Sequence, residues 1–336
     1  MSQYLEVAMS SHVREVGIKL FALKSNQKLA EEIAECVGVD LSKVRIERFS
    51  DGEISVHIEE SIRGDDVYLI QSTNDPSNEY LMELLIMIDA LRRASAGTIN
   101  VVMPYYGYGR QDRKPGPREA ITAKVVANML THAGIDRLIT LELHAPQIQG
   151  FFDIPVDHLS ATALLANHFL SLGIGGDETV VVSPDHDGVK RAREMAEMLD
   201  SPLAIIDRRI YDESKPNTYK LVGEVAGKHC ILFDDIIDTA KTVTKSCESL
   251  KQAGAEDVYV CATHPVLSGK AVDRLNKSTV KKAVVTNTIE LSKKAPSDLI
   301  EQLSVAPILG DAIKRISNYE SIKPLFDKDY VEKLMH

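Results

Sequence analysis

The sequence is poor in cysteine, and the four cysteines that it has are widely separated. Cys36, Cys230, Cys247 and Cys261 form no Cys-x-x-Cys pair. Zinc sites built on cysteine usually use closely spaced pairs, so this spacing gives no basis for one. Three of the four fall within apolar stretches typical of strands or helices. We therefore predict reduced cysteines in the core of a cytoplasmic protein.

The chain also lacks an excess of basic residues and any long hydrophobic run. Its formal net charge is −10 at pH 7, whereas nucleic-acid-binding domains usually present a basic face. The first residues, MSQYLEVAMSS, contain neither the basic nor the apolar region of a signal peptide. No apolar run approaches the ~20 residues of a membrane span. These absences predict a cytoplasmic protein with no nucleic-acid partner and no membrane partner.

What the sequence does contain is an alternation of apolar, β-rich runs with helical patterns, which is typical of an α/β fold. The alternation restarts after Pro155, so we predict two α/β units of similar size. The predicted divisions are an N-terminal extension at 1–16, a first unit at 17–155, a second unit at 156–305, and a C-terminal helix and tail at 306–336.

The same patterns predict individual elements. In the first unit we expect strands at 18–23, 67–71, 99–103 and 138–143, and helices at 27–37, 80–95 and 122–133. A hairpin is expected at 49–58, because Asp51–Gly52 is a strong turn signal. In the second unit we expect strands at 179–182, 203–206, 230–233 and 258–263, and helices at 160–172, 188–199 and 239–253. A last helix at 305–318 could pack on either unit.

The segment Cys230–Thr244, CILFDDIIDTAKTVT, is the most informative in the chain. An apolar strand is predicted to end at Phe233, two acids follow, and a threonine-rich turn opens a helix. A helix N-terminus presents free N–H groups and the positive end of the helix dipole, which favour an anion. Asp234 and Asp235 suit ribose hydroxyls or a divalent cation. The segment therefore indicates a phosphosugar site; the alternative is the ordinary end of a parallel strand.

Four further segments place polar residues at predicted strand ends or turns, and open α/β sheets bind ligands at such ends. Pro104–Lys114 combines aromatic residues with cations that could neutralise a polyphosphate. His144 and Asp185 follow two other strands, although a lone histidine in such a place is more often structural than a ligand. The fourth segment, Phe49–Glu53, has a plain hairpin turn as its alternative explanation.

Together these segments resemble ribose-phosphate diphosphokinase, also called phosphoribosyl pyrophosphate synthetase. The resemblance runs from about Ile18 to Phe326 and rests on FSDGE (49–53), IQSTNDPSNE (70–79), ELLIMIDALRRASA (83–96), PYYGYGRQDRK (104–114), LHAPQIQGFFDIPVDHL (143–159), SPDHDGVKRAR (183–193), DDIIDTAKT (234–242) and THPVLSGKAVDR (263–274). It implies two phosphoribosyltransferase-like domains, each a mainly parallel sheet flanked by helices, assembled as hexamers. It also implies Mg²⁺-dependent transfer of diphosphate from ATP to C1 of ribose 5-phosphate, giving 5-phosphoribosyl 1-diphosphate and AMP for nucleotide biosynthesis.

The resemblance also implies roles for individual residues. His144 and Asp185 match the positions that hold Mg²⁺, and Arg208 stands at the position of the catalytic lysine. The residues expected to bind ATP are Arg110 and Gln111, with Phe49, Asp51, Gly52 and Glu53 reaching the adenine from a neighbouring subunit. The residues expected to bind ribose 5-phosphate are Asp234, Asp235, Asp238, Thr239, Ala240, Lys241 and Thr242.

Regulation by ADP and phosphate is implied at a site between subunits, part of which matches Ser321 and Phe326. Removal of the residues after Asn318 is therefore expected to disturb regulation more than substrate binding.

Three departures from the family pattern leave the level of activity open. In IIDRRI (205–210) the catalytic lysine is replaced by Arg208, and the arginine two residues later by Ile210; Lys241 and Asp187 replace glycines. A planar guanidinium is not equivalent to a compact ammonium, and isoleucine carries no charge. We favour an active synthetase. The alternatives are a catalytically impaired paralogue that regulates an active partner in mixed hexamers and, with weaker support, a phosphoribosyltransferase.

Overall fold

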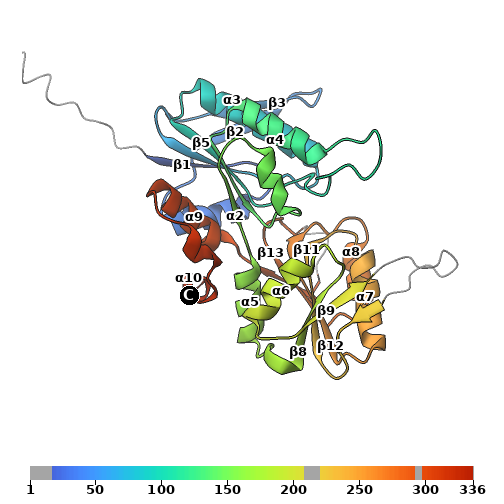
Figure 1. Cartoon of the computed structure of the whole chain (residues 1–336). Helices are drawn as coiled ribbons and strands as arrows, with labels where there is room; N and C mark the ends of the chain where they lie inside the picture. Colours follow the sequence, from blue (N-terminus) through green and yellow to red (C-terminus); the bar gives the residue numbers. More distant parts are fainter. Residues whose placement is uncertain (1–16, 208–219, 292–296, 336) are drawn as a thin grey trace, which may run out of the picture.

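The computed structural model describes residues 17–207, 220–291 and 297–335. Within these residues the chain forms two α/β units, each built on a mainly parallel sheet with helices on its faces (Figure 1). The predicted fold class is therefore confirmed.

The N-terminal sheet has five parallel strands in the order β1-β4-β5-β6-β7. Its strands are β1 (Ile18–Ala22), β4 (Asp66–Ile70), β5 (Thr98–Met103), β6 (Arg137–Leu141) and β7 (Val156–Leu159), and its helices are α2 (Gln27–Val37), α3 (Ser77–Arg93) and α4 (Thr122–Ala133). Successive strand side chains point to opposite faces. Leu20 accordingly belongs to the hydrophobic cluster that contains α2, and Phe21 to the cluster of α3 and α4. Helices on both faces explain why the strands are almost continuously apolar.

The hairpin predicted at 49–58 is present. Its strands are β2 (Val44–Arg48) and β3 (Ile54–Ile58), which pair antiparallel beside α3 (Figure 1). Gly52 in the turn has a φ of 95°, a left-handed conformation that glycine adopts without steric cost. The Asp51 side chain accepts a hydrogen bond from the Glu53 N–H. The Asp-Gly signal therefore identified the turn correctly.

The C-terminal sheet has seven strands in the order β10-β9-β8-β11-β12-β13-β14, and only β10 runs antiparallel to its neighbour. Its strands are β8 (Thr179–Ser183), β9 (Leu203–Asp207), β10 (Lys220–Val222), β11 (His229–Ile237), β12 (Asp257–Pro265), β13 (Lys282–Thr286) and β14 (Ile300–Leu303). The helices around it are α5 (Thr162–Ser171), α6 (Val189–Met198), α7 (Lys241–Gln252) and α8 (Ala271–Asn276).

Two boundaries differ from the sequence prediction in a way that matters for the site. The strand predicted to end at Phe233 continues to Ile237, because β11 pairs with β12 along this whole length. Asp234 and Asp235 are consequently strand residues whose side chains leave opposite faces. The helix predicted from Thr239 begins at Lys241, because Ala240 is in the left-handed conformation with a φ of 57°.

The two units share a core rather than meeting at a simple boundary. Strand β7 pairs with β6, so the first sheet extends past residue 155, where the first unit was predicted to end. The helix α9 (Ala306–Ser317) lies against α2 of the first unit, whereas α10 (Lys328–Leu334) packs against α5 (Figure 1). One hydrophobic cluster runs through both sheets and these helices. The C-terminal helices therefore tie the second unit to the first.

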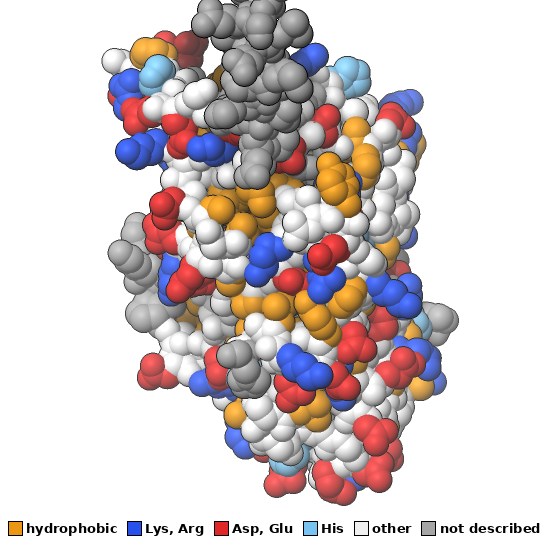
Figure 2. All heavy atoms as spheres, turned by 90° about the vertical axis from the view of Figure 1, so that its left-hand side faces the viewer, with side chains coloured by type: hydrophobic (Ala, Val, Ile, Leu, Met, Phe, Trp, Pro, Cys, Tyr) orange, Lys and Arg blue, Asp and Glu red, His pale blue; other side chains and the backbone are white. Residues whose placement is uncertain are grey.

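The face that carries α9 mixes hydrophobic side chains with cations and carboxylates (Figure 2). Among the helices that the structure describes, none combines the length and the apolar character needed to cross a bilayer.

Candidate active site

Polar residues from both units meet where the carboxyl ends of the strands face each other. Three adjoining cavities of about 330, 280 and 570 Å³ lie there. The first two share His144, Asp185, Asp234 and Asp235 as lining residues, and the second and third share Arg110 and Asp238. These six residues come from segments far apart in the sequence, and the strand ends bring them together as expected for open α/β sheets.

His144 and Asp235 form a hydrogen bond between the two units. The Nδ1 of His144 lies 2.7 Å from Oδ2 of Asp235. This bond raises the pKa of His144. Burial alone would raise the pKa of Asp235, but the bond with His144 and the charge of Arg191 outweigh it, and the pKa is lowered. Asp235 is therefore held as a buried carboxylate.

Asp234, although adjacent in sequence, has a different environment. Its Oδ1 accepts a hydrogen bond from the Asp235 N–H, and 26% of its side chain is exposed. Burial, followed by the neighbouring Asp235 charge, raises the pKa of Asp234 well above its ordinary value. The two acids therefore differ in charge preference and in access to the cavity, as opposite faces of one strand allow.

Arg191 on α6 is the cation buried among these acids. Its Nε lies 3.2 Å from Glu142 Oε1, and its Nη1 lies 3.3 Å from Asp235 Oδ1 and 3.7 Å from Asp234 Oδ1. Glu142 follows β6 in the first unit and has a φ of 39°. Arg191 thus compensates charges contributed by both units.

Arg110 and Asp238 form a second link between the units. Nη1 of Arg110 lies 2.6 Å from Oδ2 of Asp238, and the other oxygen of Asp238 accepts a hydrogen bond from Ser268. Burial opposes ionisation of Asp238, but the hydrogen bonds from Ser268 and Arg110 lower its pKa. This pair is half-exposed and lies between two cavities, so a ligand entering from either side would compete for it.

The loop Thr239–Thr242 has free N–H groups at the start of α7. Ala240 is the N-cap residue, and no side chain caps this end of the helix. Arg274 holds the turn by donating to the Thr239 carbonyl at 2.7 Å. Lys241 is the first helical residue, and its side chain is exposed. Uncapped N–H groups at a helix start are the common anion-binding arrangement.

Mg²⁺ fits the donors at His144 and Asp185. Because Nδ1 of His144 is used by Asp235, Nε2 is the ring nitrogen left for a ligand. Oδ1 of Asp185 accepts from the Gly188 N–H at 2.9 Å, and both residues line the same cavity. Among the residues that the structure describes, no three His, Cys, Asp or Glu side chains gather as a metal site. Mg²⁺ commonly takes one or two protein ligands and completes its shell with water and substrate phosphates.

The remaining predicted residues fall into four groups. Gln111 lies beside Arg110, and its side chain accepts from Thr122 Oγ1 at 2.5 Å. None of Phe49, Asp51, Gly52 and Glu53 lines the three cavities, and Phe49 is 60% exposed. Ser321 and Phe326 lie near the C-terminal helices, where the Ser321 carbonyl accepts from Arg315. Arg208, Arg209 and Ile210 lie outside the described residues.

Sequence reasoning missed the importance of Glu142 and Arg191. Arg191 was visible only as one of several cations after Asp185, and nothing in the spacing separates it from Lys190 or Arg193. Glu142 lies within LELHAP but makes its contact with a residue 49 positions away. Neither role had a local signal.

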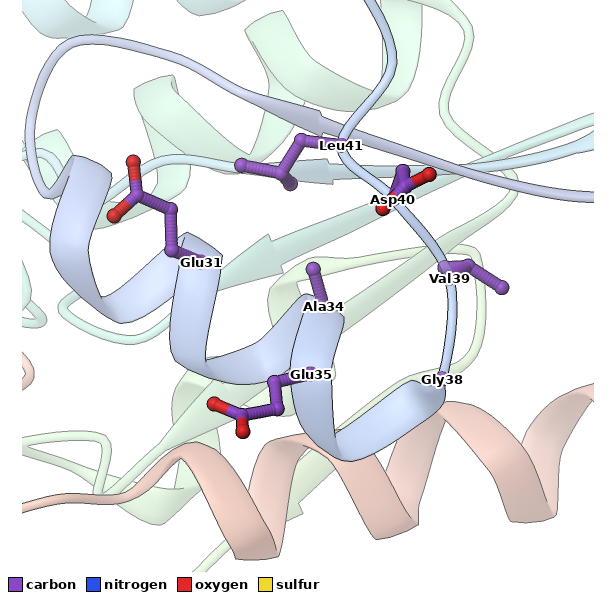
Figure 3. A pocket seen from close by; sticks show the side chains of 7 residues that line it. All are labelled: Glu31, Ala34, Glu35, Gly38, Val39, Asp40 and Leu41. Carbon is purple, nitrogen blue, oxygen red and sulfur yellow. The ribbon is translucent and has the colours of Figure 1, made fainter.

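A larger cavity, of about 700 Å³, lies away from this site. It is an open hollow between α2 and the loop that follows it (Figure 3), and its lining residues are Glu31, Ala34, Glu35, Gly38, Val39, Asp40 and Leu41. It shares no lining residue with the three cavities above and brings carboxylates without a cation or nucleophile. Its size therefore does not make it the better candidate.

Comparison with known sequences identifies the family of the chain. The model of the N-terminal domain of ribose phosphate pyrophosphokinase matches residues 18–134, and that of the phosphoribosyl synthetase-associated domain matches residues 209–327. Ribose-phosphate pyrophosphokinase 2 from Enterococcus faecalis is 56% identical over 319 residues, which cover 95% of this chain and 99% of the relative. Ribose-phosphate pyrophosphokinase from Bacillus caldolyticus is 58% identical over 310 residues, covering 92% and 98%.

A solved structure gives the same result. The crystal structure of phosphoribosylpyrophosphate synthetase from Mycobacterium smegmatis superposes with a TM-score of 0.84 at 40% sequence identity, and the match covers 90% of this chain and 99% of that one. Similarity of this extent spans both α/β units and the helices that join them. The chain therefore belongs to the ribose-phosphate pyrophosphokinase family.

Proposed function

We propose that the three adjoining cavities bind ATP and ribose 5-phosphate together and transfer the diphosphate of ATP to C1 of the sugar, giving 5-phosphoribosyl 1-diphosphate and AMP. The observation that carries the proposal is the meeting of acids suited to sugar hydroxyls with cations suited to phosphates, at the junction of both sheets. Holding two reactants in one groove supplies much of the rate enhancement for such transfers.

The sugar is assigned to the cavity beside α7. Asp234 and Asp238 offer carboxylate oxygens to ribose hydroxyls, and both side chains are more than a quarter exposed. The phosphate group is assigned to the uncapped N–H groups of Thr239–Thr242. Lys241, where the family pattern has glycine, adds a cation at the edge of this loop.

ATP is assigned to Arg110 and Gln111, with Arg113 beside the phosphate path. Because the turn Phe49–Glu53 lines none of the three cavities, its contribution to adenine binding requires a second copy of the chain. The proposal therefore includes a homo-oligomer. We extend it to a hexamer on the family resemblance, and to a cytoplasmic location on the sequence features above.

Mg²⁺ is assigned to His144 Nε2 and Asp185. When bound, the cation would neutralise charge on the transferring phosphate oxygens. The chain's own residues orient the reactants: Arg110 binds phosphate as a planar donor, and Asp235 fixes the ring of His144. The attacking oxygen is the 1-hydroxyl of the sugar, and the bond between the α- and β-phosphates of ATP breaks.

Arg208 is assigned the role of the catalytic cation on the strength of the family resemblance, and it lies outside the described residues. The replacement of lysine by Arg208 and of arginine by Ile210 favours a second function, that of a catalytically impaired subunit regulating an active partner. Asp187 supports the same alternative, because its carboxylate lies 3.5 Å from Arg113 and competes with phosphate for that cation.

ADP and phosphate are assigned as regulators at an intersubunit site that includes Ser321 and Phe326. Truncation after Asn318 is a poor test of this assignment, because Leu325 and Val331 are fully buried in the shared core. The substitution Ser321→Ala is the better test, since it removes one exposed hydroxyl. Unchanged inhibition by ADP in that variant would contradict the assignment.

The activity is tested by ³¹P NMR of the purified protein with ATP, ribose 5-phosphate, Mg²⁺ and phosphate. We expect AMP and the sugar diphosphate to appear, and His144→Ala to abolish both, which controls for a contaminating host enzyme. Nucleotide binding without product would contradict the enzyme proposal and favour the regulatory subunit. Product that persists in His144→Ala would show that the activity belongs to a contaminant.

A further inference from the structure

We propose that Asp235, held by Arg191, positions the imidazole of His144 and does not bind the ribose hydroxyls. This inference rests on the proposed function and gives the two acids different roles: Asp234 binds the sugar, whereas Asp235 orients the metal-binding histidine. The family resemblance had assigned both acids to the sugar.

The first observation is that both carboxylate oxygens of Asp235 already have a buried partner. Its Oδ2 accepts from His144 Nδ1 at 2.7 Å and its Oδ1 from Arg191 Nη1 at 3.3 Å. Only 3% of its side chain is exposed, compared with 26% for Asp234 and 28% for Asp238. A sugar hydroxyl would have to displace a buried charged partner to reach it, and breaking such a pair is costly.

The second observation is that Arg191 is fixed from the other side. Its Nε donates to Glu142, whose second carboxylate oxygen accepts from Ser160 at 3.0 Å. The Glu142 carbonyl accepts a hydrogen bond from buried His264 at 3.0 Å. Arg191 therefore cannot move without disturbing contacts from both units, so it holds Asp235 in one place.

The consequence concerns the tautomer and direction of the His144 ring. With Nδ1 bound to Asp235, the lone pair of neutral His144 lies on Nε2, which has no protein partner among the described residues. His144 lines the cavity that also contains Asp185. Metal-binding histidines generally use a carboxylate in this way, and loss of that carboxylate weakens metal binding about 10–100-fold. Asp235 and Arg191 are therefore positioning residues.

The test compares Asp235→Asn with Asp234→Asn, two nearly isosteric changes at adjacent positions. The probe is Mn²⁺ with α,β-methylene-ATP, whose bridging carbon replaces the oxygen at the bond that would break. Electron spin echo modulation of Mn²⁺ detects a directly bonded histidine nitrogen, and His144→Ala assigns that signal. We expect Asp235→Asn to weaken Mn²⁺ binding about 10–100-fold and to diminish the nitrogen signal. We expect Asp234→Asn to keep the signal and to raise the KM for ribose 5-phosphate.

A second pair of variants tests the role of Arg191. We expect Arg191→Met to weaken Mn²⁺ binding in the same direction as Asp235→Asn, whereas Arg193→Met, which removes an exposed cation from the same helix, should not. Circular dichroism checks folding, and if Arg191→Met does not fold, the isosteric Asp235→Asn variant carries the test alone.

Two results would overturn the inference: a full nitrogen signal in Asp235→Asn with a raised KM for ribose 5-phosphate, or no histidine signal in the unmodified protein. Failure of the proposed function looks different. In that case no sugar diphosphate forms, yet the nitrogen signal is present and depends on Asp235.

Discussion

The contact between α9 and α2 gives a prediction whose size follows from the structure. A Cβ added at Gly310 would lie 2.5 Å from the Cβ of Cys36 and 3.6 Å from the Ile33 carbonyl oxygen. Carbon atoms pack best at about 3.5–4.0 Å, so the substitution Gly310→Ala must separate the helices by about 1 Å. Neither of the two Cβ atoms can rotate away, because each is attached directly to the backbone of its helix.

The expected cost is a balance of two terms. Overpacking a core typically costs about 1–3 kcal/mol, and a clash between two backbone-anchored carbons belongs in the upper half of that range. Alanine in place of glycine within a helix stabilises the helix by about 1 kcal/mol. We therefore expect Gly310→Ala to lower the free energy of unfolding by about 1–2 kcal/mol, which corresponds to a fall in Tm of a few degrees.

The assay is thermal unfolding followed by circular dichroism at one fixed protein concentration, because assembly makes Tm depend on concentration. The matched control is Gly150→Ala, since a Cβ at Gly150 meets nothing within 4 Å. We expect the control to keep or slightly raise Tm. A Tm for Gly310→Ala equal to or above that of the unmodified protein would refute the close packing of α9 on α2.

Three further predictions concern the cysteines, the buried histidine and the Arg110 pair. Burial raises the pKa of Cys230 and Cys247 to about 12. Iodoacetamide at pH 8 should therefore label Cys36 first, and Cys230 and Cys247 only after unfolding, as measured by peptide mass spectrometry. Equal labelling rates for the three cysteines would contradict this prediction. Burial lowers the pKa of His264, so unfolding takes up a proton below about pH 6.5, and stability should fall as the pH drops from 7 to 5.5. The free energy of unfolding, measured with denaturant, should depend less on pH in His264→Gln than in the unmodified protein. The same dependence on pH in both proteins would contradict a buried neutral His264 ring. Finally, Asp238→Asn frees Arg110 from a half-exposed ion pair worth up to about 1 kcal/mol. Equilibrium dialysis should therefore show α,β-methylene-ATP binding up to about five-fold tighter. Weaker binding would contradict the idea that Asp238 and ATP compete for Arg110.

Local sequence was sufficient to predict much of the fold. Almost continuous apolar runs marked the buried parallel strands, since helices cover both faces of each sheet. The Asp51–Gly52 pair identified a hairpin because that turn requires a left-handed glycine. Polar residues at the strand ends identified His144, Asp185 and Asp234 as site candidates, because open α/β sheets bind ligands at such ends. Asp185 and Asp234 come from neighbouring strands of the second sheet, whereas His144 follows a strand of the first sheet.

Other features depended on contacts that no local pattern contains. Strand β7 joins the first sheet only because β6 offers an edge to it, and α9 returns to α2 only because Gly310 permits a close approach. The contact between α9 and α2 joins segments separated by more than two hundred residues. Its formation depends on the whole core.

Asp234 and Asp235 show most clearly what depends on the sequence and what depends on the tertiary structure. The sequence by itself determined the fold class, the family resemblance and the presence of two adjacent acids at a strand end. It could not distinguish Asp234 from Asp235, because both have the same chemistry. Only the tertiary structure made them different. His144, from a distant segment, bonds to Asp235 alone, and Arg191 lies 3.3 Å from Asp235 but 3.7 Å from Asp234, whose side chain stays more exposed.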